Sequence, residues 1–131
     1  MKTLNTILLA IIAISAAAQS TKTKSIMSKN VTEVVIYQIK PEKIKDFPAI
    51  LEVVRTNLSK VPGFVSYKTL RWTKEPNEFI ASENTFIDIV EWKTLEDAAN
   101  AMKAGEQNPV FGEFLGSIEK ITIMGHFDFY K

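Results

Sequence analysis

After residue 30 the chain alternates between two patterns of apolar and polar positions. In one pattern β-branched and aromatic residues recur at every second position, which is typical of β-strands. In the other, apolar residues lie three or four positions apart, which is typical of amphipathic helices. The patterns predict strands over 31–39, 64–72, 86–92 and 121–130. They predict helices that begin between Glu42 and Asp46, at Thr94, and after Asn108-Pro109.

The change of pattern is sharpest within residues 86–102. A strand-like run, Phe-Ile-Asp-Ile-Val-Glu-Trp, is followed directly by apolar residues at helical spacing: Leu95, Ala98, Ala99 and Met102. Between the two, we expect the hydroxyl of Thr94 to accept a hydrogen bond from the amide of Asp97 and so cap the helix. Asp97 also places a negative charge in the first turn, where the helix dipole favours it.

Prolines and glycines mark the expected ends of elements. Pro48 is tolerated only near a helix start, so either the first helix begins near Asp46 or a separate turn precedes it. Pro62-Gly63 should end that helix, and Gly105 should end the second. The polar connection over 73–84 contains only Phe79, Ile80 and Ala81 as a candidate short strand.

The predicted order of elements is strand, helix, strand, strand, helix, strand. This is the ferredoxin-like βαββαβ pattern, an α+β fold with a four-stranded antiparallel sheet and its helices on one face. The second strand carries charges on both faces, so we expect it near an edge. The first strand is apolar on both faces, so the face without helices also needs a cover, and a face-to-face homodimer supplies one.

The first 30 residues differ from the rest of the chain. A short positive start, the apolar run 7–14 and small residues at 15–18 together resemble a signal peptide, with cleavage expected after Ala18. An uncleaved anchor is the alternative, although the run is short for a membrane span. Residues 19–30 are polar and aperiodic and predict a flexible linker, which leaves 31–131 as a single domain. We therefore expect export to the periplasm or the medium, without membrane insertion after cleavage.

Composition excludes several classes of function. Removal of 1–18 leaves 15 basic and 15 acidic residues, so no net charge favours nucleic acid or anionic lipid. The chain has no cysteine, which excludes disulfides, a thiolate nucleophile and cysteine-based metal sites. A P-loop, a nucleophile elbow and a dinucleotide fingerprint are also absent, so an enzyme of this sequence would have to use simple machinery.

Asp88, Glu33 and His126 are the candidate catalytic residues. If the first and third strands are neighbours, alternation places Glu33 and Asp88 on apolar sheet faces, where burial shifts carboxyl pKa values and suits acid–base chemistry. Alternatively, these acids lie at a strand end or dimer face and pair with Arg71, Lys68 or backbone amides. His126 is the only histidine. It could act as a general base, or it could be a hydrogen-bonded residue on a strand surface or dimer interface.

Trp92, Tyr37 and Trp72 are the candidate ligand-binding residues, and Tyr67 and Phe127 could join them around a flat aromatic molecule. Aromatic residues at strand spacing can equally fill a core. We expect no metal site, because one histidine without a cluster of carboxylates does not supply the three or four ligands that a metal requires.

Three features give the chain a resemblance to a known family: the order of elements, Pro62-Gly63-Phe64 before the second strand, and Asp88-Ile-Val-Glu-Trp92 before the second helix. Over roughly 31–130 it resembles the antibiotic biosynthesis monooxygenase-like proteins, which are small dimeric α/β barrels. The resemblance implies a cavity between sheet and helices with Trp92 in its wall. Members include cofactor-independent oxygenases of polycyclic phenols and haem-degrading enzymes, so fold alone does not choose an activity.

Two departures from the haem-degrading members narrow this choice. Those members place an iron-binding histidine in the helix after the tryptophan, where this chain has Ala101 and Met102, and their first-strand asparagine has no counterpart in 33–39. No cofactor is therefore expected. The resemblance favours an exported, cofactor-independent monooxygenase-like protein in which one candidate catalytic residue deprotonates a phenol. The alternatives are a non-catalytic binder of a small apolar molecule and a protein that serves only self-association or partner binding.

Overall fold

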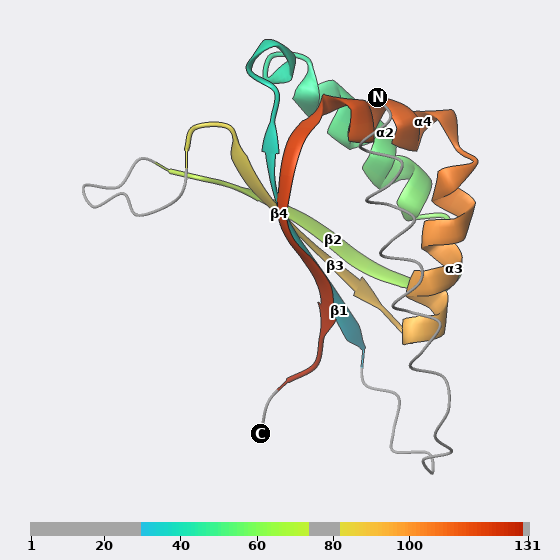
Figure 1. Cartoon of the computed structure of the whole chain (residues 1–131). Helices are drawn as coiled ribbons and strands as arrows, with labels where there is room; N and C mark the ends of the chain where they lie inside the picture. Colours follow the sequence, from blue (N-terminus) through green and yellow to red (C-terminus); the bar gives the residue numbers. More distant parts are fainter. Residues whose placement is uncertain (1–29, 74–81, 130–131) are drawn as a thin grey trace.

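The structure is a computed structural model that describes residues 30–73 and 82–129 (Figure 1). The predicted signal peptide over 1–18, the predicted linker apart from Asn30, and the candidate short strand over 79–81 lie outside the described residues. None of the helices in the described ranges is long and apolar enough to cross a membrane.

Four antiparallel strands form one sheet in the order β2-β3-β1-β4. The strands are β1 (Val31–Ile39), β2 (Phe64–Arg71), β3 (Thr85–Trp92) and β4 (Ile118–Phe127). The sheet and its order confirm the ferredoxin-like α+β fold. They also confirm that the second strand lies at an edge and that the first and third strands are neighbours.

Three α-helices in the described ranges cover one face of the sheet (Figure 1). They are α2 (Phe47–Leu58), α3 (Leu95–Glu106) and α4 (Pro109–Ser117), and a short 3-10 turn η1 (Pro41–Lys43) precedes α2. The turn and Pro48 in the first turn of α2 agree with the prediction of a separate turn before the helix. The predicted cap of α3 is present, because Thr94 Oγ1 accepts from the amide of Asp97 at 3.0 Å.

Aromatic rings fill one end of the core between the sheet and the helices. The ring of Tyr37 on β1 lies 5.7 to 6.1 Å, centroid to centroid, from the rings of Phe47, Phe86 and Phe114. Tyr37 and Phe47 are almost completely buried. Edge-to-face and offset contacts of this kind add to the free energy gained from burial, so the cluster ties α2 and α4 to the centre of the sheet.

The predicted bounds of two elements, the second helix and the last strand over 121–130, are wrong. Gly105 lies inside α3 beside the Phe111 ring of α4, and a Cβ there would make an ordinary van der Waals contact with that ring at 3.4 Å. The helix continues to Glu106. The last strand begins at Ile118 and ends at Phe127, because the backbone pairs with β1 directly after α4.

The turn between α2 and β2 is fixed at Gly63. This residue has φ 82°, a left-handed conformation that glycine adopts without steric cost. A Cβ at Gly63 would overlap the side chain of Asp97 in the first turn of α3. The Gly63 carbonyl also accepts a hydrogen bond from the amide of Lys93 at 2.8 Å, so the start of β2 is held against the start of α3.

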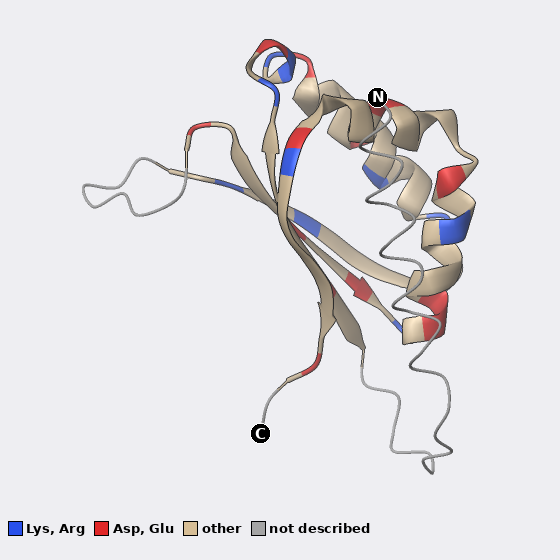
Figure 2. Cartoon of the chain, viewed as in Figure 1, with Lys and Arg blue, Asp and Glu red and all other residues tan. Residues whose placement is uncertain are grey.

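The sheet face opposite the helices carries apolar side chains without a cover from the described part of the chain. By strand alternation this face includes Val34, Ile36, Ile87 and Ile89 from the two central strands. Leu70 and Ile123 on the outer strands are about half exposed. Figure 2 shows acidic and basic residues spread over helices, loops and strands without a large area of one sign.

Candidate functional site

A cavity of about 130 Å³ lies between the sheet and the three helices. Its wall is mainly apolar and includes α2, α3, α4 and all four strands. The polar groups in the wall are few, and they come chiefly from the sheet. The apolar lining includes Val54, Leu58, Ala98, Ala101, Met102, Phe111, Phe114, Leu115, Ile118, Ile121 and Met124.

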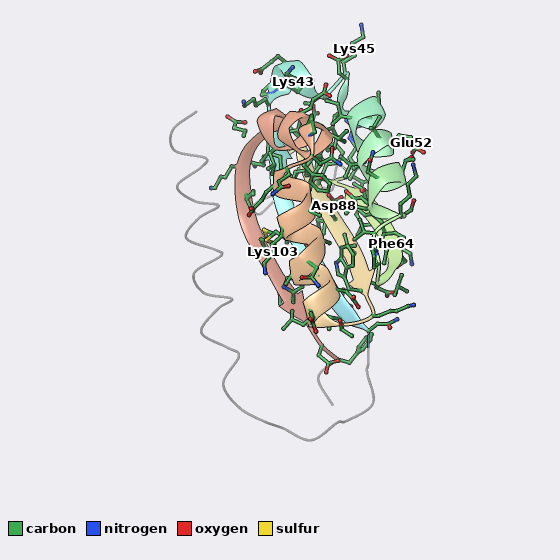
Figure 3. The ribbon with its side chains drawn as sticks, turned by 90° about the vertical axis from the view of Figure 1, so that its right-hand side faces the viewer. Lys43, Lys45, Glu52, Phe64, Asp88 and Lys103 are labelled. Atoms are coloured by element: carbon green, nitrogen blue, oxygen red, sulfur yellow. The ribbon has the colours of Figure 1, made fainter. Side chains whose placement is uncertain are left out.

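Asp88, in the middle of β3, is the most buried carboxyl group that lines the cavity (Figure 3). Three hydroxyl groups donate to it. Oδ2 accepts from Tyr37 at 2.9 Å and from Tyr67 at 2.7 Å, and Oδ1 accepts from Thr69 at 2.6 Å. Three donors from β1 and β2 therefore converge on one acid, which leaves Oδ1 with the larger free acceptor capacity.

Burial raises the pKa of Asp88 above its ordinary value, and the three hydroxyl donors and the nearby Arg55 oppose that shift. The pKa values of Tyr37 and Tyr67 are also raised, first by burial and then by the adjacent carboxylate. Both phenols therefore remain protonated donors. Arg55 lies over the Tyr67 ring, 5.4 Å from its centroid, and Tyr67 lines the cavity whereas Arg55 does not.

Glu33 is a second carboxyl group in the cavity wall. Its Oε2 accepts from Trp92 Nε1 at 3.0 Å and lies 3.7 Å from His126 Nε2 on β4. Burial raises the pKa of Glu33, opposed by the Trp92 hydrogen bond and by His126. The side chain of His126 is one-quarter exposed, so Glu33 connects the indole in the wall with a partly solvated imidazole.

The structure brings most of the predicted site residues together. Asp88, Glu33 and Trp92 line the cavity. Tyr37 is fully buried behind it and reaches the site through its hydrogen bond to Asp88, and His126 contacts Glu33 from the neighbouring strand. The acids do not pair with Arg71 or Lys68 as the alternative interpretation held; their partners in the described ranges are hydroxyl groups, an indole and the imidazole.

The predicted place of Trp72 in this cavity is wrong. Trp72 instead lines a shallow depression with Arg71, Thr73 and Glu83, next to the end of β2. The cause is a register irregularity between Phe64 and Ser66. After it, Tyr67 and Thr69 face the helices and Trp72 does not. Phe127 is half exposed and is likewise absent from the wall.

Thr69 and Arg55 are the parts of the site that sequence reasoning missed. Thr69 is paired directly opposite Asp88 in the β2–β3 register. Arg55 lies on the otherwise ordinary amphipathic helix α2, and its contact with the Tyr67 ring depends on how that helix packs on the sheet. Alternation places Thr69 on the face of Tyr67, but only the pairing of β2 with β3 shows that Thr69 lies opposite Asp88.

The wall of α3 contains Ala101 and Met102, at the place where the resemblance to haem-degrading proteins would put an iron-binding histidine. None of the described residues in the cavity wall is a histidine. The donor set of this cavity therefore does not fit haem ligation of that kind.

Comparisons with known proteins agree on the fold. The chain is similar to a conserved protein from Methanosarcina mazei Go1 (16% identity, TM-score 0.61, covering 76% of this chain and 92% of that one). It is also similar to a mutant form of SnoaB, a cofactor-independent oxygenase from Streptomyces nogalater (17%, 0.60, 78% and 94%). A third similar structure is a conserved protein of unknown function from Bacteroides thetaiotaomicron (13%, 0.57, 79% and 100%). At these identities the likeness shows the fold alone.

A search of curated protein sequences found no match. The family profile described as Antibiotic biosynthesis monooxygenase matches residues 30–114, which is more than half of the chain and includes β1, β2, β3 and α3. The chain therefore belongs to the antibiotic biosynthesis monooxygenase family.

Proposed function

We propose that this protein is an exported, cofactor-independent monooxygenase-like enzyme that acts on a small hydroxylated aromatic molecule held in the cavity. The observation that carries the proposal is Asp88: a buried carboxyl group with a raised pKa, held by three hydroxyl donors, in the wall of an otherwise mainly apolar cavity. An apolar cavity with few fixed polar groups is the usual form of a site for a small ligand.

Asp88 is suited to receive the proton of a phenol. A raised pKa makes a carboxylate a stronger base, which brings it nearer to the pKa of its substrate. Oδ1 accepts one hydrogen bond, from Thr69, so it retains acceptor capacity for a ligand hydroxyl. Asp88 is preferred over Glu33 as the base, because Asp88 is only 4% exposed whereas Glu33 lies beside the partly solvated imidazole of His126.

The reaction that this arrangement supports balances without a cofactor. The phenol gives its proton to Asp88, and the electron-rich phenolate transfers electrons to O₂ as a bond forms between oxygen and a ring carbon. The proton returns from Asp88 to give a ring hydroperoxide. Loss of the hydrogen on that carbon together with hydroxide leaves a quinone and one water molecule. One oxygen atom of O₂ thus enters the product and the other leaves as water.

The aromatic residues around Asp88 have separate roles in this proposal. Trp92 and Tyr67 line the cavity and would position the ring of the substrate. Tyr37 acts through its hydrogen bond to Asp88 and is a positioning residue. The Glu33 contact fixes the indole of Trp92.

A non-catalytic binder of a small apolar molecule is the second candidate. The same three hydrogen bonds favour it, because they stabilise the Asp88 carboxylate and weaken its tendency to take a proton. In that case Asp88 would only accept a hydrogen bond from the ligand hydroxyl. The two candidates share one cavity, so turnover separates them.

Oxygen uptake with a panel of hydroxylated aromatics tests the proposal, beside tryptophan-fluorescence and haem-absorbance titrations. We expect uptake by the wild type that is lost in folded Asp88→Asn and kept in Glu113→Gln, a control that removes an exposed acid of α4 outside the cavity wall. Saturable fluorescence quenching without uptake would favour the binder. If neither uptake nor quenching occurs, both candidates fail.

Export and dimerisation complete the proposal. The signal-like segment over 1–18 supports export to the periplasm or the medium. The apolar sheet face opposite the helices, with Leu70 and Ile123 half exposed, supports a homodimer in which two sheets meet face to face.

A further inference from the structure

The charged side chains that line the cavity are all acidic. Among the described residues they are Glu33 on β1, Asp88 on β3 and Glu106 at the end of α3, and neither a lysine nor an arginine of these ranges lines it. Two basic groups lie nearby without lining the cavity: Arg55 lies over the Tyr67 ring and acts on Asp88 through its charge, and His126 lies beside Glu33.

A ligand with a carboxylate, sulfonate or phosphate would meet an unfavourable environment here in either protonation state of the wall. If Asp88 and Glu33 are ionised, they repel the ligand's charge across a medium that screens poorly. If they are protonated, that charge is buried in a mainly apolar cavity whose described wall offers no cation for a direct ion pair. A neutral hydroxyl or an ammonium group avoids both costs, because it donates hydrogen bonds to groups that accept them.

We infer that the cavity selects apolar molecules that are uncharged or positively charged and rejects anionic molecules of the same shape. This inference rests on the proposed function for the location of the ligand, but it concerns binding and not turnover. It assigns the selection to Glu33, Asp88 and Glu106 together, which line the cavity without a cation among the described residues.

Three para-substituted toluenes of similar size test the selection: p-cresol, 4-methylbenzylamine and 4-methylbenzoate, which are neutral, cationic and anionic at neutral pH. A single ring suits the volume of about 130 Å³, since an engineered cavity of about 150 Å³ in another protein binds benzene. Equilibrium dialysis with the full chain measures each affinity. We expect 4-methylbenzoate to bind at least about tenfold more weakly than the other two probes.

Variants locate the source of the selection. Glu106→Gln changes an exposed residue at the end of α3 and should reduce the difference in affinity between 4-methylbenzoate and p-cresol. Asp88→Asn should reduce this difference further. Glu113→Gln removes an equal charge from a residue outside the wall and should leave this difference in affinity unchanged. An equal change of the affinity difference in all three variants would contradict the assignment of the selection to the acids of the cavity wall.

The outcomes separate this inference from the proposed function. Benzoate that binds as tightly as cresol overturns the inference, even if oxygen uptake occurs. Cresol and benzylamine that bind while benzoate does not support the inference, even if no uptake occurs and the proposed reaction fails. A lack of saturable binding by both cresol and benzylamine also overturns it.

Discussion

The hydroxyl of Tyr67 donates to Asp88 Oδ2 across 2.7 Å, and this bond joins the edge strand of the sheet to its neighbour within the cavity wall. The hydroxyl of Tyr37 reaches the same oxygen from the other side, from β1. Asp88 therefore links the three strands β2, β3 and β1 through side chains as well as through the backbone.

Removal of one of these hydroxyl groups should destabilise the fold. Tyr37→Phe and Tyr67→Phe should each lower the free energy of unfolding at neutral pH by about 1–2 kcal/mol, because a buried acid loses one donor. Urea denaturation measures this. A double-mutant cycle with Asp88→Asn should give a coupling of more than about 0.5 kcal/mol, and additivity would contradict the link.

The acids of the cavity should make stability depend on pH. The ordinary pKa values are 3.8 for Asp88 and 4.5 for Glu33, and burial raises both. The folded chain therefore binds these protons more tightly than the unfolded chain. Each group's contribution to stability is full below its ordinary value and is lost as pH rises through its value in the folded chain.

Asp88→Asn isolates one of these two contributions. Relative to the wild type, the variant should gain free energy of unfolding as the pH rises from weakly acid to neutral, because it no longer carries a buried charge. Denaturation in urea across that range measures the difference. A difference that is constant with pH, or that changes in the opposite direction, would show that the Asp88 pKa is not raised.

The cap of α3 should have a measurable effect. Thr94→Ala removes the acceptor of the Asp97 amide and should lower the free energy of unfolding by about 1 kcal/mol. Thr56→Ala is the control, because Thr56 is also exposed but its hydroxyl only donates back to the Glu52 carbonyl within α2. Equal denaturation midpoints for the two variants, at equal slopes, would contradict the cap.

The uncovered sheet face should carry the dimer. Ile123→Lys places a charge on that face and should convert a dimer to a monomer, as measured by light scattering. Leu95→Lys is the matched control, since Leu95 is similarly exposed but begins α3 on the helical side. A wild type that is monomeric at micromolar concentration, without concentration dependence, would argue against the proposed assembly.

The sequence predicted the parts of this fold that depend on local pattern. Alternation located β1 to the residue, and the spacing of Thr94 and Asp97 located the cap of α3, because both signals lie within a few positions of one another. The face of Glu33 and Asp88 followed from the same alternation once β1 and β3 proved to be neighbours.

The parts of the fold and of the site that the sequence did not predict depend on contacts between residues far apart in the chain. The irregularity after Phe64 reverses the alternation of β2, so the predicted place of Trp72 was wrong. Gly105 looked like a helix end, although it lies inside α3 and packs beside the ring of Phe111 from the next helix. Thr69 reached the site only through the register that sets it opposite Asp88, which no pattern within one strand reveals.

The contact between Gly63 and Asp97 also makes one corner of the fold resistant to local movement. Since the start of β2 and the first turn of α3 touch without room for a Cβ, and Lys93 bonds to the Gly63 carbonyl, this corner of the molecule opens only if both elements move together. Met102 and Met124 are partly exposed in the cavity wall, and their flexible thioether side chains can change rotamer at low cost. Rotamer changes at these two methionines can therefore alter the cavity wall, while the Gly63 corner keeps its backbone in place.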